Sequence, residues 1–148
     1  MEKFQEAREK SKLYIKAADH MASVTYNMVQ DSKVLVAAME NTFLALTHAM
    51  GSVLHYEKLF KRIPAFQDNF ESKFRVFSQK SSRRYGINRE YLRIMQEIKE
   101  MLIEQGKGGK DYLNSKLSPA QVKEYIAKAK QFVSEAEKIV SKNERIFK

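Results

Sequence analysis

The residues most able to do chemistry in this sequence are a group of cations between positions 75 and 93. This segment holds six basic side chains and one acidic one, Glu90. Within the wider stretch 61–93, nine Lys or Arg stand against three Asp or Glu, so the stretch carries +6 of the chain's net charge of +9. A basic zone of this density suits phosphate backbones, anionic membranes or an acidic protein. We predict an anion-binding elbow made of Arg75, Lys80, Arg83, Arg84, Arg89 and Arg93.

The ends of the predicted helices explain only some of these cations. A cation near the C-terminal end of a helix is stabilised by the helix dipole, which gives Lys80, Arg83 and Arg84 a structural reason to be basic. A cation in the first turn of a helix is mildly unfavourable, so the dipole gives Arg89 no structural reason to be basic. Arg93 lies one turn later, on the same outward face of the helix as Arg89. The charge at this elbow therefore exceeds what local stability requires.

Two histidines, His48 and His55, lie seven residues apart on one face of a predicted helix. A zinc site normally needs three or four ligands, and carboxylate-bridged di-iron bundles need Glu-x-x-His pairs. Ala45 and Ser52 stand where those glutamates would be. We interpret the histidines as solvent-facing or lightly hydrogen-bonded side chains. Because the chain also lacks cysteine, we expect no metal, no cofactor and no catalytic residue.

The run GKGGK at 106–110 has the composition of a phosphate-binding loop without its context. No strand precedes it, and no Gly-Lys-Ser/Thr leads from it into a helix. We interpret this run as part of a connection between two helices.

Five helices must position these residues, because apolar side chains recur in steps of three and four and turn residues fall between the recurring segments. The expected helices span 3–29, 32–62, 66–84, the stretch from Asn88 to the glycines of QGKGGK, and the stretch after Ser118. Asp31 or Ser32, Asn88 and Ser118 are the predicted N-caps, and Gly86 is the predicted C-terminal stop of the third helix. We predict a single all-α domain, 1–148, an antiparallel bundle of four long helices plus a shorter one.

The apolar patterns of these helices predict how they pack. The first helix carries a heptad seam made of Phe4, Ala7, Ser11, Tyr14, Ala18, Met21, Thr25 and Met28. In the second helix the polar residues occupy an arc of only about 140°. So wide an apolar face touches more than one neighbour, which makes this helix either central or part of a dimer contact. The third helix places four aromatic rings on one face, and we interpret them as core: Phe66, Phe70, Phe74 and Phe77.

Three stretches on these helices, AAMENTFLALTHAMG, NREYLRIMQEIKEML and DYLNSKLSPAQVKEYIAKAKQFVSEAE, resemble the HEPN superfamily of small helical bundles. The resemblance covers most of the chain. It implies a bundle that tends to homodimerise and is involved with RNA, nucleotides or a partner protein. The ribonuclease members of that family carry an Arg followed after four to six residues by a His. No Arg in this sequence is followed by a His at that spacing, so the resemblance transfers no catalytic residue.

Together these patterns predict a binding protein, not an enzyme, which contacts nucleic acid, RNA favoured, through the elbow at 75–93. The alternative is a protein–protein interaction or homodimeric scaffold module that acts through the second helix without nucleic acid. The N-terminus, MEKFQEAREK, lacks the apolar run of a signal peptide, and the longest apolar run, VLVAAM, is too short to span a bilayer. We expect a cytoplasmic protein with no membrane association.

Overall fold

A computed structural model of the chain describes residues 1–108 and 117–142, which form helices and no strand. The helical segments are α1 (Lys3–His20), η1 (Met21–Thr25), α2 (Tyr26–Val29), α3 (Ser32–Leu59), α4 (Phe70–Val76), η2 (Phe77–Ser81), α5 (Ser82–Arg84), α6 (Arg89–Gly108) and α7 (Pro119–Ser141). Two rods are continuous through a π-turn, α1–η1–α2 and α4–η2–α5. The described chain therefore contains five helical rods, and the predicted all-α bundle is confirmed. The predicted connection after α6, including most of GKGGK, lies outside the described residues.

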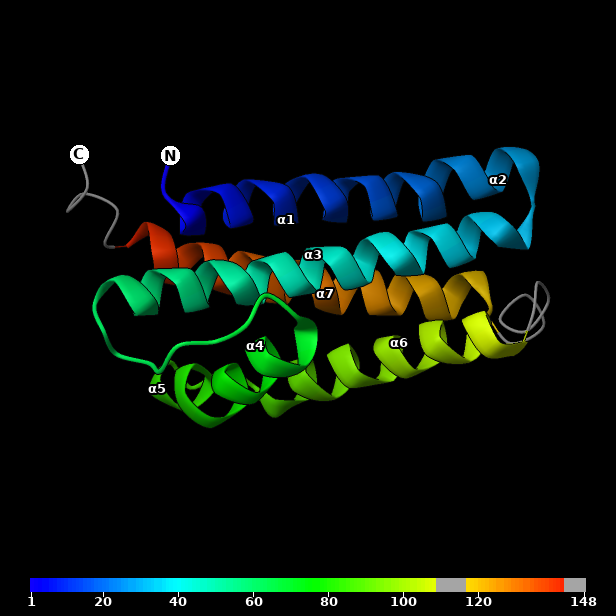
Figure 1. The fold of residues 1–148 in the computed structure, drawn as a ribbon. Coiled ribbons are helices and arrows are strands. Elements are labelled where there is room, and N and C mark those ends of the chain that lie inside the picture. The colour runs from blue at the N-terminus through cyan, green and yellow to red at the C-terminus, as the bar shows by residue number, and fades with distance from the viewer. Residues whose placement is uncertain (109–116, 143–148) are drawn as a thin grey trace.

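The four long helices lie side by side, and the chain direction alternates from each to the next (Figure 1). The shorter rod α4–η2–α5 lies beside α3 and leads into α6. Local signals set the helix ends, since four side chains accept a hydrogen bond from a backbone N–H two or three residues later, at 2.8–3.1 Å: Asp31, Asn69, Asn88 and Ser118. The caps predicted at Asp31, Asn88 and Ser118 are confirmed.

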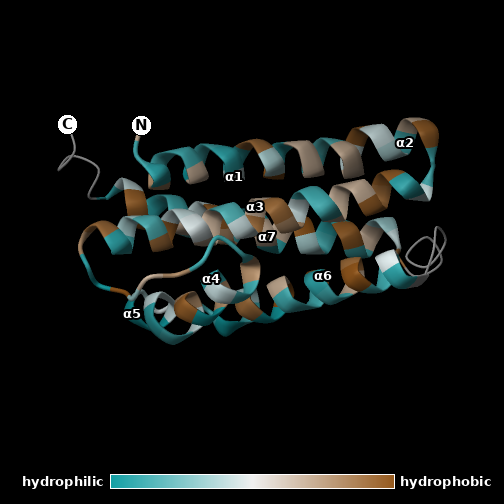
Figure 2. Ribbon diagram, viewed as in Figure 1, coloured by the Kyte–Doolittle hydropathy of each residue, from teal (hydrophilic) through white to brown (hydrophobic). Residues whose placement is uncertain are grey.

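The helix α3 is the centre of the bundle. It packs against α1, α7, α6 and α4, and its buried residues include large apolar side chains such as Leu35, Met39 and Leu54. In Figure 2 hydrophobic residues run through α3 and α7, whereas the first turns of α1 are hydrophilic. Of the two sequence-based possibilities, a central helix or a dimer contact, the central position accounts for most of the apolar circumference of α3 within one chain.

By length and composition alone, α3 could also cross a membrane, and it is the one helix in residues 1–108 and 117–142 that could. Half of its most apolar window is buried in the bundle. A buried core helix and a membrane span share this apolar composition. In the bundle, the other helices supply the apolar surroundings.

The predicted heptad seam of the first helix packs against the bundle as far as Met21: Phe4, Ala7, Ser11 and Ala18 are buried, and Tyr14 and Met21 are partly buried against the core. The buried residues are Phe4, Ala7, Ser11, Ile15, Ala18 and Ala22. Met28, the last predicted seam residue, is 78% exposed. The buried residues follow a spacing of about 3.6, the repeat of a straight α-helix, which drifts away from a strict repeat of 3.5. Ile15 and Ala22 are therefore buried more deeply than the neighbouring seam residues Tyr14 and Met21.

The third helix starts later than predicted, at Phe70 and not at Phe66. Asn69 caps it by accepting from Ser72 N over 2.8 Å, and the Ser72 hydroxyl accepts in turn from Gln67 N over 2.8 Å. These bonds hold residues 67–69 as a capped turn. The prediction that the four phenylalanines pack in the core is nevertheless confirmed. Phe77 is fully buried, and the other three rings are partly buried against the core: Phe66, Phe70 and Phe74.

Candidate functional site

The predicted elbow is formed by the rod α4–η2–α5, the turn at residues 85–88 and the first turn of α6. Gly86 makes this turn sharp, since its φ of 63° is open to glycine at little cost, and the predicted helix stop at this position is confirmed. All six predicted site residues are solvent-exposed. Their contacts divide them into two groups, one held by carboxylates and one without such partners.

Arg84 is held by a buried carboxylate. Its Nε donates to Glu57 Oε1 over 2.9 Å, and its terminal nitrogen donates to the carbonyl of Arg62 over 3.3 Å. Glu57 is 0% exposed and also accepts from the hydroxyl of Ser81 over 3.3 Å. Its second oxygen lies 3.7 Å from the Arg62 guanidinium. Because a buried carboxylate needs cationic partners, Arg84 has a structural task that joins the end of α3 to α5.

This buried ion pair was missed in the sequence, although a signal was present. Glu57 falls outside the polar arc of α3, on the apolar side. A charged residue on the apolar face of a core helix is rarely buried unless it is paired. The pair also affects Tyr85, because burial, and then the nearby carboxylate of Glu57, raises the pKa of that phenol.

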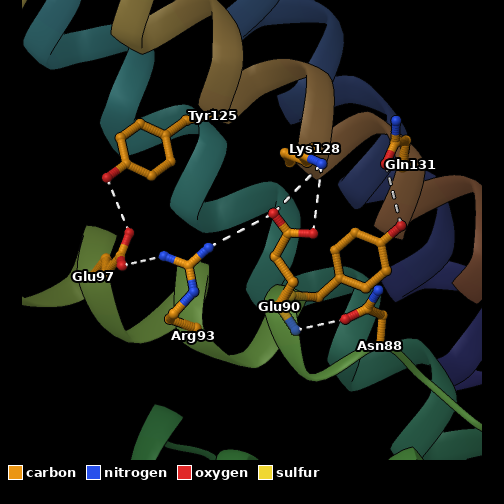
Figure 3. A network of polar contacts seen from close by, with 8 residues as sticks. Asn88, Glu90, Arg93, Glu97, Tyr125, Lys128 and Gln131 are labelled. Atoms are coloured by element: carbon orange, nitrogen blue, oxygen red, sulfur yellow. Dashed lines mark hydrogen bonds and ion pairs between the residues drawn. The ribbon is translucent and has the colours of Figure 1, made fainter.

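Arg93 is held in a network between α6 and α7, shown in Figure 3. Its guanidinium pairs with Glu97 and, over 3.6 Å, with Glu90. Glu97 also accepts from the hydroxyl of Tyr125 over 3.1 Å, while Lys128 reaches Glu90 over 3.4 Å. Burial, and then the bond to Glu97, raises the pKa of Tyr125. Arg93 is thus one member of a balanced set of charges that links two helices.

The other four cations have no such partners. Arg75, Lys80, Arg83 and Arg89 are exposed, and none makes an ion pair or a hydrogen bond through its side chain within the described residues. The first three lie on the rod α4–η2–α5. Arg89 is the first residue of α6, after a turn of four residues. We call these four residues the elbow face.

The π-turn brings part of the elbow face into line. Ser82 N–H bonds to the carbonyl of Phe77, five residues earlier, so the rod contains one residue more than a regular α-helix. Arg75 and Arg83 would be about 80° apart in a regular helix, whereas the inserted residue brings them within about 20° of each other. Lys80 lies on the same side of the rod, within an arc of about 100°.

A second polar surface, which was not predicted, lies between α1, α3 and the chain from Phe66 to Lys73. It is a groove of about 330 Å³ whose lining includes His48 and His55. Both imidazoles are half-buried. The His48 ring stacks on Tyr14 with 5.4 Å between centroids, and the His55 ring contacts Phe66 at 5.3 Å. Each imidazole therefore lines the groove and also packs against an aromatic ring, so the interpretation of these histidines as solvent-facing or lightly hydrogen-bonded lacked these two ring contacts.

The structure thus keeps four of the six predicted site residues as candidates for ligand contact and gives Arg84 and Arg93 structural partners. Across residues 1–108 and 117–142, no group of three or more His, Asp or Glu side chains is placed to hold a metal ion. Comparison of the chain with protein-family models, curated proteins and solved structures gave no match.

Proposed function

We propose that this protein binds nucleic acid, RNA favoured, through the elbow face formed by Arg75, Lys80, Arg83 and Arg89. The observation that carries the proposal is that these four exposed cations lack carboxylate partners in the described structure, whereas their neighbours Arg84 and Arg93 are paired. Three of these unpaired cations share one side of the rod α4–η2–α5, and Arg89 follows them after the turn at residues 85–88; such a group of cations suits a row of phosphates. The preference for RNA follows from the resemblance to the HEPN superfamily.

If binding occurs through phosphate contacts, the affinity should have two properties. It depends weakly on base sequence, because phosphates carry no sequence information. It also depends strongly on salt, because each neutralised phosphate releases counterions. Four contacts to a single strand give a slope of log K against log salt of about −3, so the affinity falls about 50-fold between about 50 and about 200 mM salt.

The test is fluorescence anisotropy with a short single-stranded RNA over a salt series. The test variant changes Arg75, Lys80, Arg83 and Arg89 to Gln. The control variant removes the same total charge from four exposed lysines elsewhere that have no ion pair in the described structure: Lys16, Lys33, Lys123 and Lys142. We expect the elbow variant to lose most of the affinity and most of the salt slope, and the control to lose little. Equal losses in both variants would show attraction by net charge alone, and intact binding in the elbow variant would reject the site.

A further inference from the structure

The groove between α1, α3 and the chain from Phe66 to Lys73 concentrates cations that do not belong to the elbow face. Four ammonium groups from three helices line it: Lys3 and Lys10 on α1, Lys58 on α3 and Lys73 on α4. A neighbouring hollow of about 430 Å³ shares Lys3, His55 and Lys58 with it. The volume of the groove is within the range of small-molecule sites.

Most of this positive charge is not neutralised by the protein. Within the described structure, Lys3, Lys10 and Lys58 form no ion pair with a carboxylate. Lys73 pairs with Asp68 over 2.7 Å, but the side chain of Asp68 is 94% exposed. Glu6 is the other acidic residue that lines the groove. The balance of charge in the groove is therefore positive and favours an anion.

The two histidines add neutral hydrogen-bonding groups to these cations. Neither ring makes a hydrogen bond within the described residues, and the two lie about 10 Å apart along one side of α3, from the helical rise over seven residues. Burial lowers the pKa of both imidazoles, and the surrounding lysines, chiefly Lys10 for His48 and Lys73 for His55, lower it further. Asp68 acts in the opposite direction on both rings. At neutral pH each ring therefore offers one N–H donor and one acceptor nitrogen.

Gly51 lies between the two histidines, on the floor of the groove. With no side chain at this position, the ammonium of Lys73 comes close to α3, since the nearest heavy atom to an added Cβ would be Lys73 Nζ at 3.9 Å. The glycine thus leaves the middle of the groove open between the two imidazoles. On its far side, Phe66 supplies an aromatic wall, over which Lys58 sits 5.4 Å from the ring centroid.

We propose that this groove binds a phosphate monoester, with its dianion among the lysines and its organic part against Phe66. A monoester matches the groove in three respects. It carries close to two negative charges near pH 7, it has three acceptor oxygens for ammonium and imidazole donors, and its ester group fills space that a free phosphate ion would leave empty. The same chemistry is found in a small phosphate ester and at the phosphorylated end of a nucleic-acid strand. The proposal does not depend on the elbow face.

A bound dianion reverses the effect of the lysines on the histidines. The cations Lys3, Lys10, Lys58 and Lys73 disfavour an imidazolium, whereas a dianion beside the rings favours one. Binding must then raise the pKa of His48 and His55, so that it is accompanied by an uptake of protons. By the same coupling, protonation of the two imidazoles strengthens binding of the dianion.

The test uses phenyl phosphate as the probe and the NMR titration of the histidine ring protons as the readout. The chain has three histidines, and the exposed His20 lies outside the groove, so it serves as an internal reference. We expect phenyl phosphate to raise the pKa of His48 and His55 and to leave His20 unchanged. Phenyl sulfate has the same shape and one charge fewer, and it should bind more weakly. Absence of any shift at millimolar phenyl phosphate, or equal shifts in all three histidines, would overturn the proposal.

Matched variants locate the binding and identify the source of the phosphate. Changing Lys10 and Lys58 to Gln should weaken phenyl phosphate binding by at least about tenfold, whereas Lys16→Gln with Lys33→Gln, which removes the same charge outside the groove, should not. The elbow variant should keep this binding, which separates a failure here from a failure of the proposed function. In a parallel arm, tighter binding of a 5′-phosphorylated RNA than of its 5′-hydroxyl form, lost in the Lys10 and Lys58 variant, would assign the groove to strand ends. Equal binding of both RNAs would assign it to small esters.

Discussion

Replacing Arg84 with Met distinguishes a structural arginine from one that is available to a ligand. Arg84 Nε lies 2.9 Å from the Oε1 of Glu57, which is fully buried. A hydrogen bond to a charged group contributes about 1.5–3 kcal/mol, and a buried charge that loses its partner is left strongly destabilised. In the variant, Glu57 would keep only Ser81 at 3.3 Å and Arg62 at 3.7 Å. Because Met preserves most of the apolar stem, we expect the free energy of unfolding to fall by about 2–3 kcal/mol.

The reverse change, Glu57→Gln, should cost less. The side chains of Arg84 and Arg62 are each 42% exposed, so both can turn toward water when the carboxylate is removed. The amide keeps an acceptor for Ser81, and we expect a loss of about 1 kcal/mol. Because the two residues are in contact, the double variant should lose less than the sum of the single losses, with a coupling energy of about 1–2 kcal/mol.

Urea denaturation followed by circular dichroism measures these differences, and thermal unfolding should show a fall in Tm of about 2–4 °C per kcal/mol. Arg83→Met is the matched control, since Arg83 is the exposed neighbour without a described partner, and it should change stability by less than about 0.5 kcal/mol. If Arg84→Met cost no more than this control, the ion pair would contribute nothing to the fold. Arg84 would then return to the group of cations available for nucleic acid.

Three further predictions concern the helices that frame the groove and the elbow. Gly51→Ala should raise the free energy of unfolding by about 0.5–1 kcal/mol, because an added Cβ meets no heavy atom closer than 3.9 Å; a lowered Tm would contradict this. Ser118→Ala should cost about 1 kcal/mol through loss of the α7 cap, and Ser134→Ala, exposed in the middle of the same helix, should cost nothing by the same urea assay. Lowering the pH from about 7.5 to about 5.5 should destabilise the protein, because the pKa of His48 and His55 is depressed in the fold and the unfolded chain takes up protons first as the pH falls below about 6.5. The variant with both histidines changed to Asn should show a weaker pH dependence in urea titrations, and an unchanged one would refute this origin.

The parts of the fold that could be predicted from the sequence are those set by neighbouring residues. The caps at Asp31, Asn88 and Ser118 each bond within three residues, and Gly86 ends its helix through its own backbone angle. The apolar stripe of α7 was also predictable, because Val122 and the residues that continue its spacing are all buried: Ile126, Ala129, Val133, Ala136 and Val140. In each case the cause lies within one or two helical turns.

The parts that could not be predicted depend on partners far along the chain. The ion pair of Glu57 and Arg84 joins residues 27 positions apart, so the sequence alone assigned Arg84 to the elbow. The groove is assembled from α1, α3 and the chain up to α4. Periodicity within α3 placed His48 and His55 on one face of the helix without showing which segments pack beside that face. In both cases the sequence shows the types of the residues, whereas the partners of these side chains and their burial can be seen only in the packed bundle.

The π-turn at Phe77–Ser81 is the local feature on which the elbow face depends. Its sequence, FSQKS, carries no signal that separates it from an ordinary helical turn, yet both of its end residues, Phe77 and Ser81, are 0% exposed. Ser82, whose N–H bonds to the carbonyl of Phe77, is also buried, at 3% exposed. In a regular α-helix Phe77 and Ser82, five positions apart, would lie about 140° apart, whereas the inserted residue brings them within about 40° of each other on the buried side. The same insertion rotates the residues that follow it, which brings Arg83 into line with Arg75. Core packing and the alignment of the cations therefore have a single cause, and a change that restores regular α-helical geometry in this rod must disturb both.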